Sequence, residues 1–106
     1  MKLSEENCRQ SKTGDPPLSP DETKNLITCI PPWTLADKTI QREFSFKDFH
    51  QSMDFVNKVA DLAEEQNHHP DILISYSQVK LVLSTHKVGG LTRNDFILAA
   101  KIDLLV

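Results

Sequence analysis

The sequence of 106 residues has no long apolar run and only two cysteines, and each scarcity excludes a class of protein. No apolar stretch approaches the roughly 20 residues that a membrane-spanning helix needs. Cys8 and Cys29 do not form a Cys-x-x-Cys pair, so we expect two free thiols and no disulfide framework. The first residues lack the apolar core of a secretory signal, which predicts a cytoplasmic protein.

The chain also lacks a concentrated positive charge. Its 12 basic and 15 acidic residues give a net charge of −3, and the basic residues are scattered. Because nucleic-acid-binding proteins usually carry a clustered basic face, we expect no direct nucleic-acid contact. The length suffices for one domain with one hydrophobic core, and the hydrophobic content of 39% is ordinary for a globular protein.

The N-terminal segment differs in composition from the rest of the chain. Residues 1–17 are mostly polar and end in Gly14, Asp15, Pro16 and Pro17. Such a segment has little apolar surface to offset the entropy lost when a chain becomes ordered. We therefore expect a flexible N-terminal arm over residues 1–17 and a single domain over residues 18–106.

The first half of the domain predicts a helix followed by a hairpin. Ser19, Pro20 and Glu22 form the pattern of a capping box that opens a short helix, and Pro31 and Pro32 end it. Residues 39–46 then alternate between apolar and polar, with Arg42 as the misfit on the apolar face. Residues 33–35 supply a partner strand.

The second half predicts a long helix, a second hairpin and a final helix. Apolar residues recur at helical spacing over residues 47–67, and Pro70 disfavours helical backbone just before it. Residues 71–85 predict two strands with a turn near Ser77 and Gln78, and Thr92 with Asp95 caps a last helix. The resulting fold class is α+β, a four-stranded antiparallel sheet with three helices packed on one face.

Three histidines, His68, His69 and His86, lie in a short stretch that Glu64 and Asp95 bracket. Histidine both donates and accepts protons near neutral pH, so the cluster suggests proton-transfer chemistry. Other uses remain open: Glu64 and His68 could form a helix-end ion pair, Asp95 could only cap its helix, and the set could bind a metal ion.

Taken together, these positions resemble the signature of the pterin-4a-carbinolamine dehydratases. The resemblance continues upstream through residues 44–49 and downstream through residues 84–86 and 90–92, and it covers about residues 19–106. Animal members carry an aromatic residue two places after the signature proline, where this chain has Ile72. The signature is filled by Glu64, His68, His69, Pro70, Tyr76, His86 and Asp95.

The resemblance implies an enzyme that removes water from a 4a-hydroxytetrahydropterin to give quinonoid dihydropterin, with no cofactor and no metal ion. That reaction recycles the tetrahydrobiopterin used by aromatic amino-acid hydroxylases. The family also implies a homo-oligomer, a dimer or tetramer. An alternative reading is a dimerisation cofactor or interaction module for a transcription factor, since animal relatives have such a role.

The resemblance also implies roles for single residues. We expect His68 and His86 to exchange protons with the substrate and His69 to hold and polarise it. Glu64 would orient His68, and Asp95 would support His86 or cap the last helix. The other residues expected to bind or support the substrate are Trp33, Ser84 and Thr85.

Overall fold

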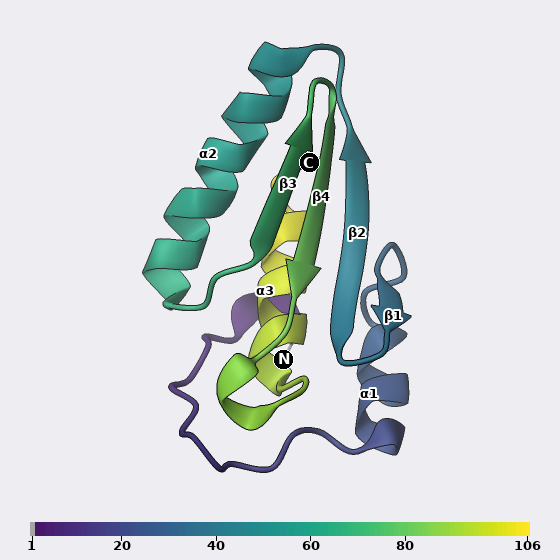
Figure 1. The fold of residues 1–106 in the computed structure, drawn as a ribbon, viewed down its shortest axis with the longest axis vertical. Coiled ribbons are helices and arrows are strands. Elements are labelled where there is room, and N and C mark those ends of the chain that lie inside the picture. The colour runs from purple at the N-terminus through teal and green to yellow at the C-terminus, as the bar shows by residue number, and fades with distance from the viewer. Residues whose placement is uncertain (1) are drawn as a thin grey trace.

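The computed structural model describes residues 2–106 and confirms the α+β class. Four strands form one antiparallel sheet in the order β1-β2-β4-β3, and the three α-helices lie on one face of it (Figure 1). Within residues 2–106 the elements are η1 (Leu3–Glu5), α1 (Pro20–Ile27), β1 (Thr34–Ala36), β2 (Thr39–Ser45), α2 (Phe49–Gln66), β3 (Asp71–Ser75), β4 (Gln78–Leu83), η2 (His86–Val88) and α3 (Arg93–Asp103), where η marks a 3-10 helix.

The hydrophobic core lies between the helices and the covered face of the sheet. The register pairs Ile40 with Leu83 and Phe44 with Val79 across β2 and β4, so that these side chains share one face and are buried. The intervening residues alternate to the opposite face, where Leu73 is exposed. The period-two pattern in the sequence therefore identified the buried side of the sheet.

The predicted start of α1 is confirmed, and both predicted hairpins are present. The Ser19 hydroxyl accepts a hydrogen bond from the Glu22 amide at 3.2 Å, and the Glu22 carboxylate accepts one from the Ser19 amide at 3.0 Å. The backbone hydrogen bond from Ser19 is the main reason that the pKa of Glu22 lies below its ordinary value.

Both hairpin turns use a left-handed residue other than glycine. Asp37 has φ 55° in the β1–β2 turn, and Tyr76 has φ 50° in the β3–β4 turn. Because Ser75 pairs with Gln78, the second turn consists of Tyr76 and Ser77, one residue earlier than predicted. The shift arises because Tyr76 adopts a backbone conformation that the sequence pattern does not signal.

Arg42, the polar misfit on the covered face of the sheet, is paired with the last residue of α3. Its Nη1 donates to Asp103 Oδ1 at 2.6 Å, and its guanidinium lies 4.3 Å from the centre of the Phe44 ring. The buried Trp33 indole also donates to Asp103 Oδ1, at 2.8 Å. One carboxylate therefore joins the sheet, the β1 end and α3.

We expect Asp103→Ala to lower the free energy of unfolding by about 2 kcal/mol, because it leaves the Trp33 donor buried without an acceptor and Arg42 without its anion. Urea unfolding followed by circular dichroism measures the change. Asp103→Asn keeps an acceptor oxygen and should lose less. If the free energy of unfolding of the Asp103→Ala variant lay within about 0.5 kcal/mol of the parent value, this role would be contradicted.

Residues 3–11 of the N-terminal arm have packing partners that the sequence analysis did not anticipate. Leu3 is buried, and the Lys101 ammonium donates to the Ser4 carbonyl at 2.9 Å. The purple chain in Figure 1 runs beside α3 before it turns towards α1. The sequence pattern missed these contacts because they join residues far apart in the chain, and several use backbone groups, which composition does not reveal. The boundary at residue 18 and the mobility of the arm stay predictions.

Candidate functional site

The end of α2 determines where the adjacent histidines lie. Asn67 ends the helix in a left-handed conformation with φ 52°, and the His68 amide donates back to the Ala63 carbonyl at 3.2 Å. This arrangement satisfies the last carbonyls of the helix and turns the chain away from the helix axis. Pro70 follows, so His68 and His69 occupy a tight connection between α2 and β3.

His68 is held by a buried carboxylate from α3. Its Nε2 lies 2.6 Å from Asp95 Oδ1, and the Asp95 side chain is completely buried. The second oxygen, Oδ2, accepts from the Thr85 hydroxyl and from the Thr92 amide, both at 2.9 Å. Asp95 therefore caps α3 with one oxygen, which was one of its two expected roles, and its other oxygen binds His68.

His69 is paired with Glu64, and this corrects the predicted pairing. We expected Glu64 to orient His68, but the Glu64 carboxylate lies 2.5 Å from His69 Nε2. We expected Asp95 to support His86 or cap the last helix, and it caps α3 while it binds His68. The expected pairing required helical geometry as far as His68, whereas α2 ends at Gln66. Both members of the observed pair are exposed, so this contact contributes little to stability.

His86 comes from a different part of the fold than His68 and His69. It follows β4 and begins η2, and the imidazole is exposed. Within residues 2–106 no hydrogen bond involves the His86 ring, in contrast to His68 and His69. Its imidazole nitrogens are therefore free to interact with a bound molecule.

One cavity of about 290 Å³ brings the three histidines together. Ser84 and Thr85, which the resemblance gave as substrate-binding or supporting residues, also line it. Asp95 does not line the cavity but contacts His68, which does. The volume is near the lower end of the range for small-molecule sites. Its remaining walls are formed by Arg9, Gln10, Ser11, Asn67, Lys87 and Asn94.

Trp33 is not among the residues that line this cavity, so the cavity gives no support to its expected place beside the substrate, which stays a prediction. Its side chain is only 3% exposed, and it packs edge-on against Phe44 with ring centres 6.3 Å apart. The indole donor is used by Asp103. Trp33 is therefore part of the core, where its large apolar surface is covered.

The sequence interpretation missed the contribution of the N-terminal arm to the cavity. The Cys8 amide donates to Gln66 Oε1 at 2.8 Å, and the Arg9 amide donates to Asn94 Oδ1 at 2.9 Å. The Asn94 amide nitrogen donates back to the Arg9 carbonyl at 2.5 Å. These reciprocal bonds hold residues 9–11 beside the histidines, and no local sequence signal identifies a contact over so long a separation.

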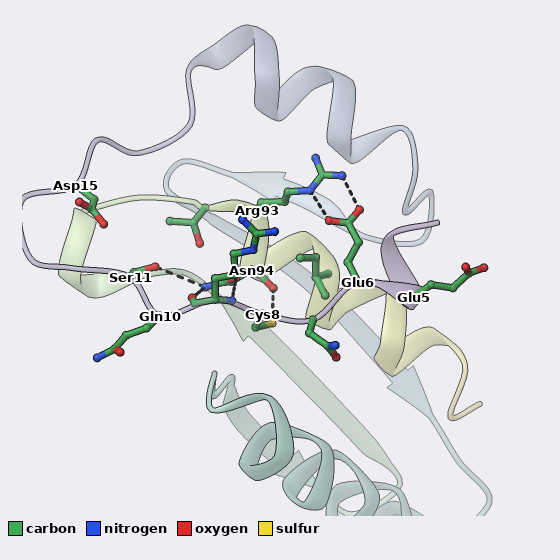
Figure 2. A pocket seen from close by; sticks show the side chains of 12 residues that line it. Glu5, Glu6, Cys8, Gln10, Ser11, Asp15, Arg93 and Asn94 are labelled. Atoms are coloured by element: carbon green, nitrogen blue, oxygen red, sulfur yellow. Dashed lines mark hydrogen bonds and ion pairs between the residues drawn. The ribbon is translucent and has the colours of Figure 1, made fainter. Parts of the chain in front are cut away.

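A second cavity, of about 680 Å³, lies on the other side of the arm against the start of α3. Figure 2 shows Arg93 bound to both carboxylate oxygens of Glu6. Its Nε donates to Oε1 at 2.8 Å, and its Nη2 donates to Oε2 at 2.6 Å. This pairing lowers the pKa of Glu6 and raises that of Arg93. Burial raises the pKa of the Cys8 thiol to about 11, so this thiol is not activated as a nucleophile.

Residues 2–106 contain no group of three or more His, Cys, Asp or Glu side chains arranged to hold a metal ion. The absence of a metal from the reaction nevertheless stays a prediction. No helix in the same part of the chain is long and apolar enough to cross a membrane. The expected free thiols are confirmed, because neither Cys8 nor Cys29 forms a disulfide.

The fold and the cavity define a small α+β domain whose histidine site lies where α2, β4 and α3 meet. The family described as pterin 4 alpha carbinolamine dehydratase matches residues 16–105. The chain belongs to this family, which confirms the resemblance seen in the sequence.

Bacterial relatives extend the similarity across nearly the whole chain. A protein of Nitrosomonas eutropha is 44% identical over 105 residues, which cover 98% of this chain and 93% of that protein. A protein of Rubrobacter xylanophilus is 44% identical over 104 residues and covers 97% of both chains. Both carry the name "Putative pterin-4-alpha-carbinolamine dehydratase".

Two solved structures share the fold. A transcriptional coactivator/pterin dehydratase from Brucella melitensis is 30% identical and covers 84% of this chain and 97% of its own, with a TM-score of 0.80. A pterin dehydratase-like protein described as a RuBisCO assembly factor in the alpha-carboxysome has a TM-score of 0.57 and 24% identity. It covers 69% of this chain and 84% of its own, and it supports the fold alone.

Proposed function

We propose that this chain is a dehydratase that converts 4a-hydroxytetrahydropterin to quinonoid dihydropterin by histidine general acid and base catalysis. The observation that carries the proposal is the shared cavity of His68, His69 and His86, with a buried carboxylate fixing one of the rings. Family membership supports the same reaction class.

The chemistry needs one proton removed and one supplied. The C4a–O bond breaks as the hydroxyl leaves with an added proton as water, and the N5 proton is lost while the C4a–N5 double bond forms. No electron acceptor is required. A well-placed proton transfer contributes roughly 10²–10⁴-fold to the rate.

The surroundings of the three imidazoles support a different role for each. An ionised Asp95 can only accept, so His68 presents Nε2–H to it, and the neutral form of the ring then carries its lone pair on Nδ1. We assign His68 as the base for the N5 proton, with Asp95 as a positioning residue that stabilises the charge formed. His86 then donates to the leaving hydroxyl, and His69, oriented by Glu64, holds and polarises the substrate.

A stopped-flow assay on chemically generated carbinolamine tests the proposal directly. We expect the purified protein to accelerate dehydration well above the spontaneous rate and to retain this activity after exhaustive chelation. A rate equal to the spontaneous one would contradict the proposed function. Loss of activity on chelation, restored by added metal, would instead indicate a metal-dependent enzyme.

A second candidate function is that of an interaction module for a transcription factor. The Brucella melitensis structure supports it, because its description combines transcriptional coactivator with pterin dehydratase. A protein that bound such a partner but left the carbinolamine unchanged would favour this alternative. We prefer the enzyme because a binding role alone needs no set of proton-transferring residues in one cavity.

We further propose that the chain self-associates as a dimer or tetramer. The edge strand β3 supports this, because Leu73, Ile74 and the adjoining Tyr76 expose apolar surface beside unpaired backbone groups. We also propose a cytoplasmic enzyme that needs no cofactor, contacts neither nucleic acid nor membrane, and recycles tetrahydrobiopterin for an aromatic amino-acid hydroxylase.

A further inference from the structure

The charge around the histidine cavity is one-sided. Arg9 from the N-terminal arm and Lys87 from η2 both line it, and no carboxylate residue does. The two cations are far apart in the sequence, so their convergence on one cavity is a property of the fold. The ion pairs among residues 2–106 include neither of them.

Three carboxylates near the cavity have partners among the described residues, although Arg9 also lines the second cavity, which Glu5 and Asp15 share. Asp95 is completely buried, and its oxygens are used by His68, Thr85 and Thr92. Glu64 contacts His69, and the rest of its side chain faces solvent, because that side chain is 79% exposed. Glu6, the acid whose charge reaches Arg9, lies in the second cavity and has both oxygens bound by Arg93.

We propose that Arg9 and Lys87 form an anion-recognising rim that selects pterins whose side chain carries a carboxylate or phosphate group. The inference rests on the proposed function, in which the pterin ring occupies the histidine end of the cavity. A guanidinium offers donors in a fork that matches carboxylate and phosphate oxygens, and an ammonium adds a point charge.

The arm holds Arg9 in place for this role. The Arg9 amide and carbonyl are both bound to the Asn94 side chain, at 2.9 and 2.5 Å, and the preceding amide is bound to Gln66. The backbone of Arg9 is therefore tied to α2 and α3, whereas its side chain is exposed. A fixed backbone lowers the entropy lost when the guanidinium closes on a ligand.

Fluorescence titration with a matched pair of oxidised pterins tests the rim. The probes are 6-hydroxymethylpterin and its phosphate ester, with 6-carboxypterin as a second anion. At low ionic strength we expect the anionic probes to bind about tenfold more tightly than the neutral one. In the double variant R9Q/K87Q this ratio should fall to near one.

Lys80→Gln is the matched control, because it removes one positive charge from β4 outside the cavity lining. It should keep the preference for anionic probes. Equal binding of neutral and anionic probes by the parent protein, or a preference that persists in R9Q/K87Q, would overturn the inference. If one of these results were found in a protein that turns over the carbinolamine, the anion-recognising rim would be refuted and the proposed function would stand. If the protein neither turned over the carbinolamine nor bound any pterin, the rim and the proposed function would both be refuted.

Discussion

Replacing His68 or His86 by alanine is expected to lower kcat for carbinolamine dehydration by at least tenfold, and by as much as roughly 10²–10⁴-fold where the proton transfer is lost completely. The two imidazoles line one cavity and come from different elements, so each removal should deprive the substrate of a different proton-transfer partner. Stopped-flow single-turnover measurements separate this loss from weaker binding.

His50→Ala is the control for the histidine variants, because His50 is exposed on α2 and lies outside the cavity lining. His86→Ala should leave the unfolding free energy nearly unchanged, since its side chain is also exposed. His68→Ala leaves Asp95 without one partner and should cost about 1–3 kcal/mol. Unchanged turnover in both catalytic variants would refute the assignment.

Asp95→Ala is expected to have the largest effect on stability, because three groups lose the same acceptor. The His68 ring, the Thr85 hydroxyl and the Thr92 amide all bond to this buried carboxylate. We expect the free energy of unfolding to fall by about 3 kcal/mol, which urea unfolding measures. A change below about 1 kcal/mol would show that water or another group replaces the carboxylate.

Asp95→Asn separates the positioning role from the structural one. Its amide keeps one acceptor oxygen, so the stability loss should be smaller than in Asp95→Ala. Catalysis should nevertheless fall, because an amide nitrogen facing His68 favours the wrong imidazole tautomer. Nitrogen-15 NMR of the ring should show the proton on Nε2 in the parent and on Nδ1 in the variant. An unchanged tautomer and rate would contradict the role.

Most of the fold could be predicted from local sequence patterns. The capping box at Ser19 and Glu22 and the helical spacing between residues 47 and 67 identified α1 and α2, and alternation identified the buried face of the sheet. These features depend on residues a few positions apart, whose geometry is fixed by the helix or strand that contains them. The histidine cluster was visible because its three members lie in a short stretch of sequence, whereas their convergence on one cavity depends on how the elements pack.

The pairing of acids with imidazoles could not be predicted in this way. Whether Glu64 met His68 or His69 depended on the left-handed turn at Asn67, and Asp95 reached His68 only through the packing of α3 beside the end of α2. Long-range backbone contacts likewise placed Arg9 in the site. Such contacts depend on tertiary packing, which no local pattern encodes.

The ion pair between Arg42 and Asp103 also constrains how the protein is made. It ties β2 to the end of α3, and β2 has β4 as its inner sheet neighbour. A nascent chain emerging from the ribosome can form α2 early, but the sheet stays incomplete until β4 appears and Arg42 stays without its anion until residue 103 has been synthesised. Final assembly of this domain therefore awaits the synthesis of α3, and the apolar face of β2 needs protection from aggregation until then.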